Sequence, residues 1–165
     1  MMKRISDKIH MALKAQLKNE LDSSRLYLAM SQWLEFNGWF GAAKLWKKYA
    51  DEELVHVDRF YKYMQDRNAM PCTPVAKEQP TEFKGIKEIV IASYEHEVQV
   101  SNWIRDIALA ALNEKDLHTY DFMMELIREQ TEEEAKTLYW VDRVEMLEQQ
   151  NVSLFFLDKE FSKGA

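Results

Sequence analysis

The chain has 165 residues, of which 47% are hydrophobic and 30% are charged, a balance that fits one folded domain over residues 1–165 and excludes a disordered chain. All three prolines lie between Pro71 and Pro80, so long stretches contain no helix breaker, which excludes collagen-like and most all-β chains. The 22 Lys and Arg against 28 Asp and Glu give a net charge of -6, the wrong sign for a general nucleic-acid binder. A cationic partner fits this charge better.

The helix breakers divide the chain into four long segments with helical periodicity and a short tail. Ser6 can cap the first helix, the Asn37-Gly38 step ends it, and Asp116 can cap the fourth. The predicted helices cover residues 6–36, 39–66, 85–112, 116–149 and 153–162.

The lengths of the connections predict how these helices are arranged. The first and second helices, and the third and fourth, are joined by only a few residues, so each pair forms an antiparallel hairpin. The middle link, about residues 67–84, can reach about 60 Å at about 3.3 Å per residue, and a helix of about 28 residues is only about 42 Å long. We therefore expect an all-α four-helix bundle of about residues 6–149, with one long crossover between helices two and three and a short fifth helix.

The tail is rich in apolar side chains but too short to form a stable helix alone. Its apolar residues are Leu154, Phe155, Phe156, Leu157 and Phe161. Two alternatives remain: the tail packs back on its own bundle, or it forms a contact between copies of the chain.

Each long helix places an ionisable or amide side chain near the middle of its apolar stripe. Buried carboxylates are strongly unfavourable unless they are paired, protonated or bound to a metal. We expect no Lys or Arg on these stripes at that level, and a histidine there is largely neutral at pH 7. A divalent or trivalent metal is therefore the predicted counter-ion. The side chains are Glu20, Glu53 with His56 about 60° away, Glu97, and Gln130 with Glu133 one turn on.

The spacing Glu53-x-x-His56 puts a carboxylate and an imidazole on one helix face, as dinuclear carboxylate sites do. The single cysteine, Cys72, excludes Cys-rich zinc and iron–sulfur sites, so oxygen and nitrogen must hold any metal. The alternative for Glu20 or Glu97 alone is a surface carboxylate, and for His56 alone an ordinary, partly buried histidine. For all of these side chains to be exposed, the buried face of all four helices would have to be assigned wrongly, which is improbable.

A second acidic cluster is predicted beside the first, because Glu129, Glu132 and Glu133 fall within about 100° of helical arc and Glu52 precedes Glu53. The alternative is a solvated helix face, which we expect for Glu134.

Tyr27 lies two turns from Glu20 on the same face. It is either a core residue or a hydroxyl that donates hydrogen bonds or an electron near an oxidised metal. We expect His10, His96 and His118 to be structural.

Over its whole length the chain resembles the non-haem ferritins of bacteria and archaea. The resemblance rests on Glu20 with Tyr27, Glu52-Glu53-x-x-His56, Glu97 within Tyr94-Glu95-His96-Glu97, and Gln130-x-x-Glu133. It implies two adjacent iron sites, a neighbouring Gln130 and a third iron site. The implied ligands are Glu20, Glu53 and His56 at the first site, Glu53, Glu97 and Glu133 at the second, and Glu52, Glu129, Glu132 and Glu133 at the third.

The resemblance also implies an iron-storage ferroxidase that oxidises Fe(II) with O₂ or H₂O₂ and keeps Fe(III) as a mineral core inside a shell of 24 subunits. We expect no haem, because Leu54 stands where the related bacterioferritins have a haem-ligating methionine. The charged N-terminus and the lack of a long apolar run predict a cytoplasmic protein without a membrane partner. The alternatives are a peroxide-detoxifying di-iron bundle with incidental storage, a purely structural bundle, or a subunit specialised for mineral nucleation.

Overall fold

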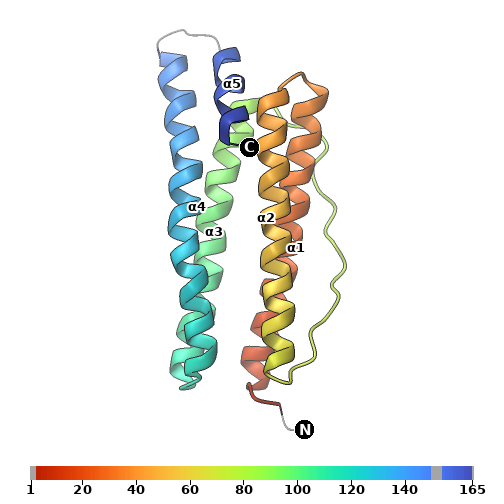
Figure 1. Cartoon of the computed structure of the whole chain (residues 1–165), viewed down its shortest axis with the longest axis vertical. Coiled ribbons are helices and arrows are strands. Elements are labelled where there is room, and N and C mark those ends of the chain that lie inside the picture. The colour runs from red at the N-terminus through yellow and green to blue at the C-terminus, as the bar shows by residue number, and fades with distance from the viewer. Residues whose placement is uncertain (1–2, 150–153, 165) are drawn as a thin grey trace.

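The computed structural model describes residues 3–149 and 154–164, and this part of the chain is a bundle of helices (Figure 1). No strand occurs among the described residues. The predicted helices are confirmed to within about two residues, except that the predicted start of the fifth at residue 153 lies outside the described residues. The helices are α1 (Asp7–Phe36), α2 (Phe40–Asp66), α3 (Ile86–Asn113), α4 (Leu117–Gln149) and α5 (Phe155–Gly164).

The predicted helix ends follow from local hydrogen bonds. The Ser6 hydroxyl accepts a hydrogen bond from the backbone N–H of Ile9, at 3.1 Å, and caps α1. Asp116 caps α4 in the same way, since its Oδ1 accepts from the N–H of Thr119 at 3.1 Å. Gly38 has φ 85° between α1 and α2, a conformation that favours glycine and lets the chain reverse.

Two hairpins, α1–α2 and α3–α4, pack together, and the segment between α2 and α3 runs the length of the bundle along α1 (Figure 1). This arrangement confirms the predicted crossover. The segment contacts α1 at three heights, through the pairs Met70–His10, Lys77–Asp22 and Phe83–Trp33.

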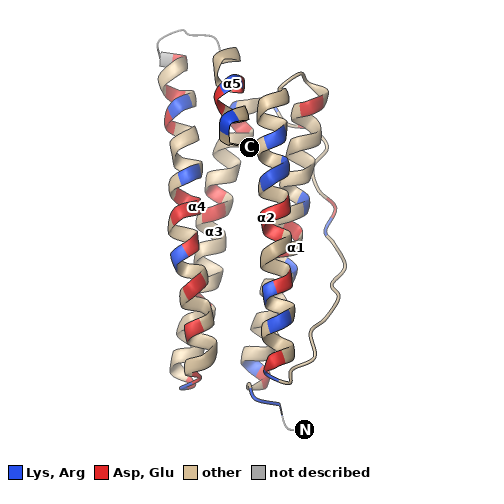
Figure 2. Ribbon diagram, viewed as in Figure 1, with Lys and Arg blue, Asp and Glu red and all other residues tan. Residues whose placement is uncertain are grey.

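The apolar core forms two separate clusters along the bundle. One contains Trp46 and Tyr49 and the other Phe60 and Met64. In each of the four long helices a buried polar residue lies in sequence between the parts that feed the two clusters, and Figure 2 shows acidic positions at mid-height in all four. These interrupting residues are Glu20, Glu53, Glu97 and Gln130.

The tail helix α5 packs on α2 of its own bundle. Leu157 and Phe161 are buried, and the Phe161 ring lies 5.3 Å from that of Trp46 and 4.4 Å from that of Trp140, between centroids. The first of the two alternatives for the tail is therefore correct for these side chains. Phe156 stays 66% exposed. Across the described ranges, no helix has both the length and the apolar character needed to cross a bilayer.

Candidate metal centre

Three of the predicted site residues come together where α1 meets α2. Glu20, Glu53 and His56 each offer one ligand atom, and these atoms lie within 4.8 Å of one another. His56 Nδ1 is 3.2 Å from Glu53 Oε2 and 3.7 Å from Glu20 Oε2. Both glutamates are buried and the histidine is partly buried, so this is a group of ionisable side chains inside the bundle, as predicted.

Glu20 has one oxygen that the protein leaves without a hydrogen bond. Gln16 Nε2 donates to Glu20 Oε1 at 2.8 Å, whereas the buried Oε2 has no hydrogen-bond partner in the described structure. A buried carboxylate oxygen without a partner costs free energy unless a ligand meets it. Its position beside Glu53 and His56 fits a cation held by oxygen and nitrogen.

Glu97 enters the same layer from α3. The Tyr27 hydroxyl donates to Glu97 Oε1, and Gln130 Nε2 donates to Oε2 at 2.9 Å. The structure thus brings Tyr27 and Gln130 to a carboxylate, not merely into the core. Burial and the charges of Glu133 and Glu20 raise the pKa of Glu97 to about 7, against the two hydrogen bonds, which lower it.

Glu53 and His56 hold their protons more tightly than usual in the metal-free centre, whereas the interactions of Glu20 with His56 outweigh its burial and lower the pKa of Glu20. Burial, together with the charges of Glu20 and Glu97, raises the pKa of Glu53 well above its ordinary value. Burial alone would lower the pKa of His56, but the neighbouring carboxylates of Glu20 and Glu53 favour the charged imidazole and raise it to about 11. The expectation of a largely neutral His56 is therefore wrong for the metal-free centre, and metal binding must displace protons here.

Basic residues nevertheless reach the carboxylates at the edge of this layer, although no Lys or Arg is among the buried residues of the described chain. Lys136 Nζ lies 2.7 Å from Glu133 Oε1. On the other side of the cluster Arg59 is paired with Glu129, whose Oε2 is 3.7 Å from His56 Nε2.

Of the other residues of the predicted acidic cluster, Glu52 is partly buried and Glu132 is exposed. Three carboxylates, Glu20, Glu53 and Glu97, are therefore buried in one layer of the bundle. The other four lie at its edge, where solvent reaches them to different extents: Glu52, Glu129, Glu132 and Glu133.

One supporting residue was missed. Gln16 lies one turn before Glu20 on the same face of α1, and that spacing was the available signal. His96, expected to be structural, lies 2.7 Å through Nε2 from the Ser23 hydroxyl and meets the Tyr27 ring edge-on at 5.7 Å, between centroids. Burial lowers the pKa of His96, so it supports Tyr27 as a neutral ring.

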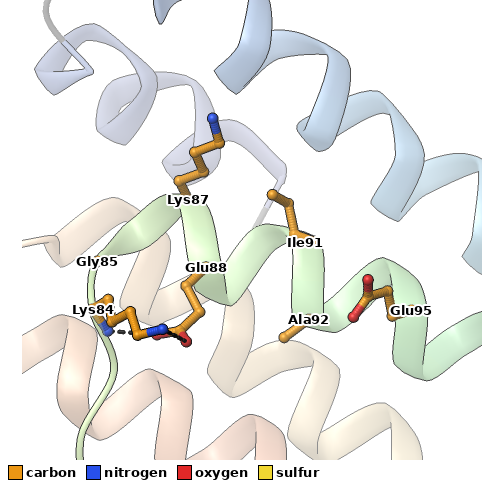
Figure 3. Close-up of a pocket in the computed structure, with 7 residues that line it drawn as sticks. All are labelled: Lys84, Gly85, Lys87, Glu88, Ile91, Ala92 and Glu95. Atoms are coloured by element: carbon orange, nitrogen blue, oxygen red, sulfur yellow. Dashed lines mark hydrogen bonds and ion pairs between the residues drawn. The ribbon is translucent and has the colours of Figure 1, made fainter.

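A separate surface hollow lies along the N-terminal part of α3, with a volume of about 540 Å³ (Figure 3). Its acidic side chains, Glu88 and Glu95, lie well apart along the helix, and Glu88 is paired with Lys84. These groups do not converge on one point, so the buried carboxylate layer is the candidate site.

Comparison with known proteins agrees with this fold and centre. Residues 11–147 match the sequence model of a family described as "Ferritin-like domain". The bacterial non-heme ferritin of Escherichia coli O6:H1 is 31% identical over 150 residues, 91% of either chain. That of Bacteroides fragilis 638R is 32% identical over 159 residues, 96% of this chain and 99% of the relative. The solved structure of an open pore ferritin from Archaeoglobus fulgidus superposes with a TM-score of 0.93 at 32% identity, over 98% of each chain. The chain is therefore a member of the ferritin family.

Proposed function

We propose that this protein oxidises Fe(II) at the buried carboxylate centre and stores the Fe(III) as a mineral inside a shell made of its own copies. The observation that carries the proposal is Glu20 Oε2, a buried carboxylate oxygen that has no hydrogen-bond partner in the described structure and lies beside Glu53 and His56. Family membership supports iron as the cation.

The ligands divide naturally into two groups that share one residue. Glu20, Glu53 and His56 would hold the first Fe(II) ion. Glu53 would reach the second ion as a bridge, and Glu97 and Glu133 would complete that site. Gln130 stands beside it and orients Glu97 through the hydrogen bond to Oε2. Proteins use such supporting hydrogen bonds to fix the direction of ligands.

The ligand chemistry favours oxidation. Carboxylate oxygens are hard ligands that bind Fe(III) more strongly than Fe(II), so a site rich in them lowers the reduction potential of the iron. Each of two Fe(II) ions gives up one electron. O₂ accepts the two electrons and two protons to form H₂O₂, and H₂O₂ accepts two electrons and two protons to form two waters. The protein's part is to hold both ions at one place, where an oxidant can take both electrons.

Storage requires assembly, and the family resemblance implies a closed shell of 24 chains. With a chain mass of 19.6 kDa, such a shell has a mass of about 470 kDa. The acidic balance of the chain, net charge -6, favours the accumulation of cations. We retain the cytoplasm as the predicted location.

The test compares two glutamates that lie two residues apart on α3. Glu97 is buried and bonded to Tyr27, whereas Glu95 is exposed. Fe(II) is mixed with the apo protein and O₂, and oxidation is followed by absorbance. We expect Glu97→Ala to slow oxidation at least about tenfold and Glu95→Ala to behave like the wild type. Equal oxidation rates in the two variants would contradict the assignment of Glu97 to the iron-oxidising centre.

Light scattering and iron retention on the same samples test storage. A mass near 470 kDa with retained iron supports it. Rapid oxidation by peroxide in a small assembly that retains no iron would favour the detoxifying alternative.

A further inference from the structure

The ammonium group of Lys136 is paired with one member of the outer carboxylate cluster, which consists of Glu52, Glu129, Glu132 and Glu133. Its Nζ is 2.7 Å from Glu133 Oε1, one turn back along α4. Lys136 also lines a surface pocket of about 280 Å³ together with Glu52 and Tyr49 of α2. The lysine therefore lies at a pocket that α4 and α2 line together, with Glu52 on its α2 side.

The charges around Lys136 come from both helices. Burial lowers its pKa, but the hydrogen bond with Glu133 and the charges of Glu133, Glu52 and Glu132 raise it above the ordinary value. Glu133 thus contacts the ammonium group, and the charges of Glu52 and Glu132 act on it from farther away. These carboxylates are three of the four residues that the resemblance implies for a third iron. The fourth, Glu129, is paired with Arg59.

We propose that Lys136 is a tethered cation that stands in the place of the third iron, so that a metal binds at Glu52, Glu132 and Glu133 only when the ammonium group moves away. This inference rests on the proposed function, because it concerns iron that enters or leaves the two buried sites. It makes Lys136 a residue that sets how many metal ions each chain binds tightly.

The side chain suits this role because it can leave. A lysine is a compact point charge on a flexible stem, and the Lys136 side chain is 46% exposed. Ion pairs that water reaches are weak, so a metal ion can compete for Glu133. An ammonium group within about 4 Å of a dication nevertheless repels it. Displacement should therefore cost the third metal at least about tenfold in affinity.

The test is an anaerobic Fe(II) titration by calorimetry of the assembled, iron-free protein. The main variant is Lys136→Met, which removes the charge and keeps the length of the side chain. Lys136→Arg keeps the charge. Lys62→Met is the matched control, since Lys62 also forms an ion pair with an acid one turn away, Asp66 at 2.5 Å.

We expect two tight binding events per chain in the wild type and in Lys62→Met. In Lys136→Met a third event should appear, or an existing weak one should tighten at least about tenfold, and Lys136→Arg should resemble the wild type. A third event of equal affinity in all four proteins would overturn the proposal. Loss of the two tight events in Lys136→Met, without a gained one, would also overturn it, because Lys136 would then only position Glu133.

The outcomes separate the two proposals. If the wild type binds no Fe(II) tightly, the proposed function fails and this inference fails with it. If the two tight events are present and Lys136→Met changes nothing, only this inference fails.

Discussion

The carboxylate of Asp158 in α5 accepts a hydrogen bond from the backbone N–H of Gly41 in the first turn of α2, at 3.0 Å, and a second from Ala42 at 2.9 Å. The residue at the N-terminal cap of α2, Trp39, makes no side-chain capping bond. A carboxylate at this position satisfies free N–H groups and faces the positive end of the helix dipole. The tail helix thus caps a helix that lies far from it in sequence.

This contact requires a glycine at position 41. A Cβ there would lie 1.8 Å from the backbone oxygen of Asp158, so we expect Gly41→Ala to displace α5 from α2. Asp158→Ala is the matched variant, because it removes the cap without filling the space and should cost about 1 kcal/mol of unfolding free energy. Urea unfolding should show a larger loss for Gly41→Ala. Equal losses of unfolding free energy in the two variants would mean that α5 accommodates the added Cβ by a shift that costs no stability.

The shared ligand gives the most direct test of the iron chemistry. We expect Glu53→Ala to abolish rapid Fe(II) oxidation while the helical content stays unchanged, because it removes the proposed bridge and a buried carboxyl group. His56→Ala should weaken the first iron site more than the second. Stopped-flow oxidation and circular dichroism measure the two effects. A wild-type oxidation rate in Glu53→Ala would refute the assignment.

The raised pKa of Glu53 predicts how stability depends on pH in the metal-free protein. A carboxyl group whose pKa is higher in the folded than in the unfolded chain stabilises the fold fully below the unfolded value, near 4.5, and loses this contribution as the pH rises through the folded value. Glu53→Gln stays neutral at every pH. We therefore expect its unfolding free energy to exceed that of the wild type by a margin that grows as the pH rises.

Thermal unfolding in the presence of a chelator, at about pH 5 and about pH 8, measures this margin. Added metal provides the control, because ligands that bind only the folded state stabilise it and Glu53→Gln should lose most of that gain. A margin that is constant with pH would show that Glu53 does not titrate as described.

The fold and the inner site could be predicted because both depend on the helical period. Apolar side chains recur on one face of each long segment, so a carboxylate at the centre of that face, such as Glu20 or Glu53, must be buried. The clustering of Glu20, Glu53 and His56 then follows from hairpins whose helices meet at the same height.

The pair of Lys136 with Glu133 has the i, i+3 spacing that the helical period predicts, but the pair of Arg59 with Glu129 joins two helices and could not be predicted in this way. The helical period fixes the face of α2 on which Arg59 lies, but not the partner that its long side chain reaches. The cap from Asp158 was equally hidden, because it depends on where the tail folds back and not on a local pattern. Contacts that long side chains or distant segments make need the three-dimensional structure.

The tail provides the last prediction, which separates docking on the bundle from assembly of the shell. Truncation after Asn151 should leave four long helices, because their own apolar stripes remain. It removes Leu157 and Phe161 from the core, and burial of each large side chain contributes about 2 kcal/mol. We therefore expect a folded bundle of lower melting temperature, with Trp46 newly exposed to solvent and to fluorescence quenchers.

A pair of variants on α5 then tests its role between subunits. In ferritin-like shells the fifth helix meets its symmetry mates at the fourfold axis, and the resemblance implies the same contact here. Phe161→Ala removes a buried ring, so it should lower the melting temperature. Phe156→Ala removes a ring that is 66% exposed in the single chain, so it should leave that temperature nearly unchanged but reduce the assembled mass or the retention of iron. Unchanged light scattering and unchanged iron retention in both Phe156→Ala and the truncated chain would show that the shell closes through its other interfaces alone.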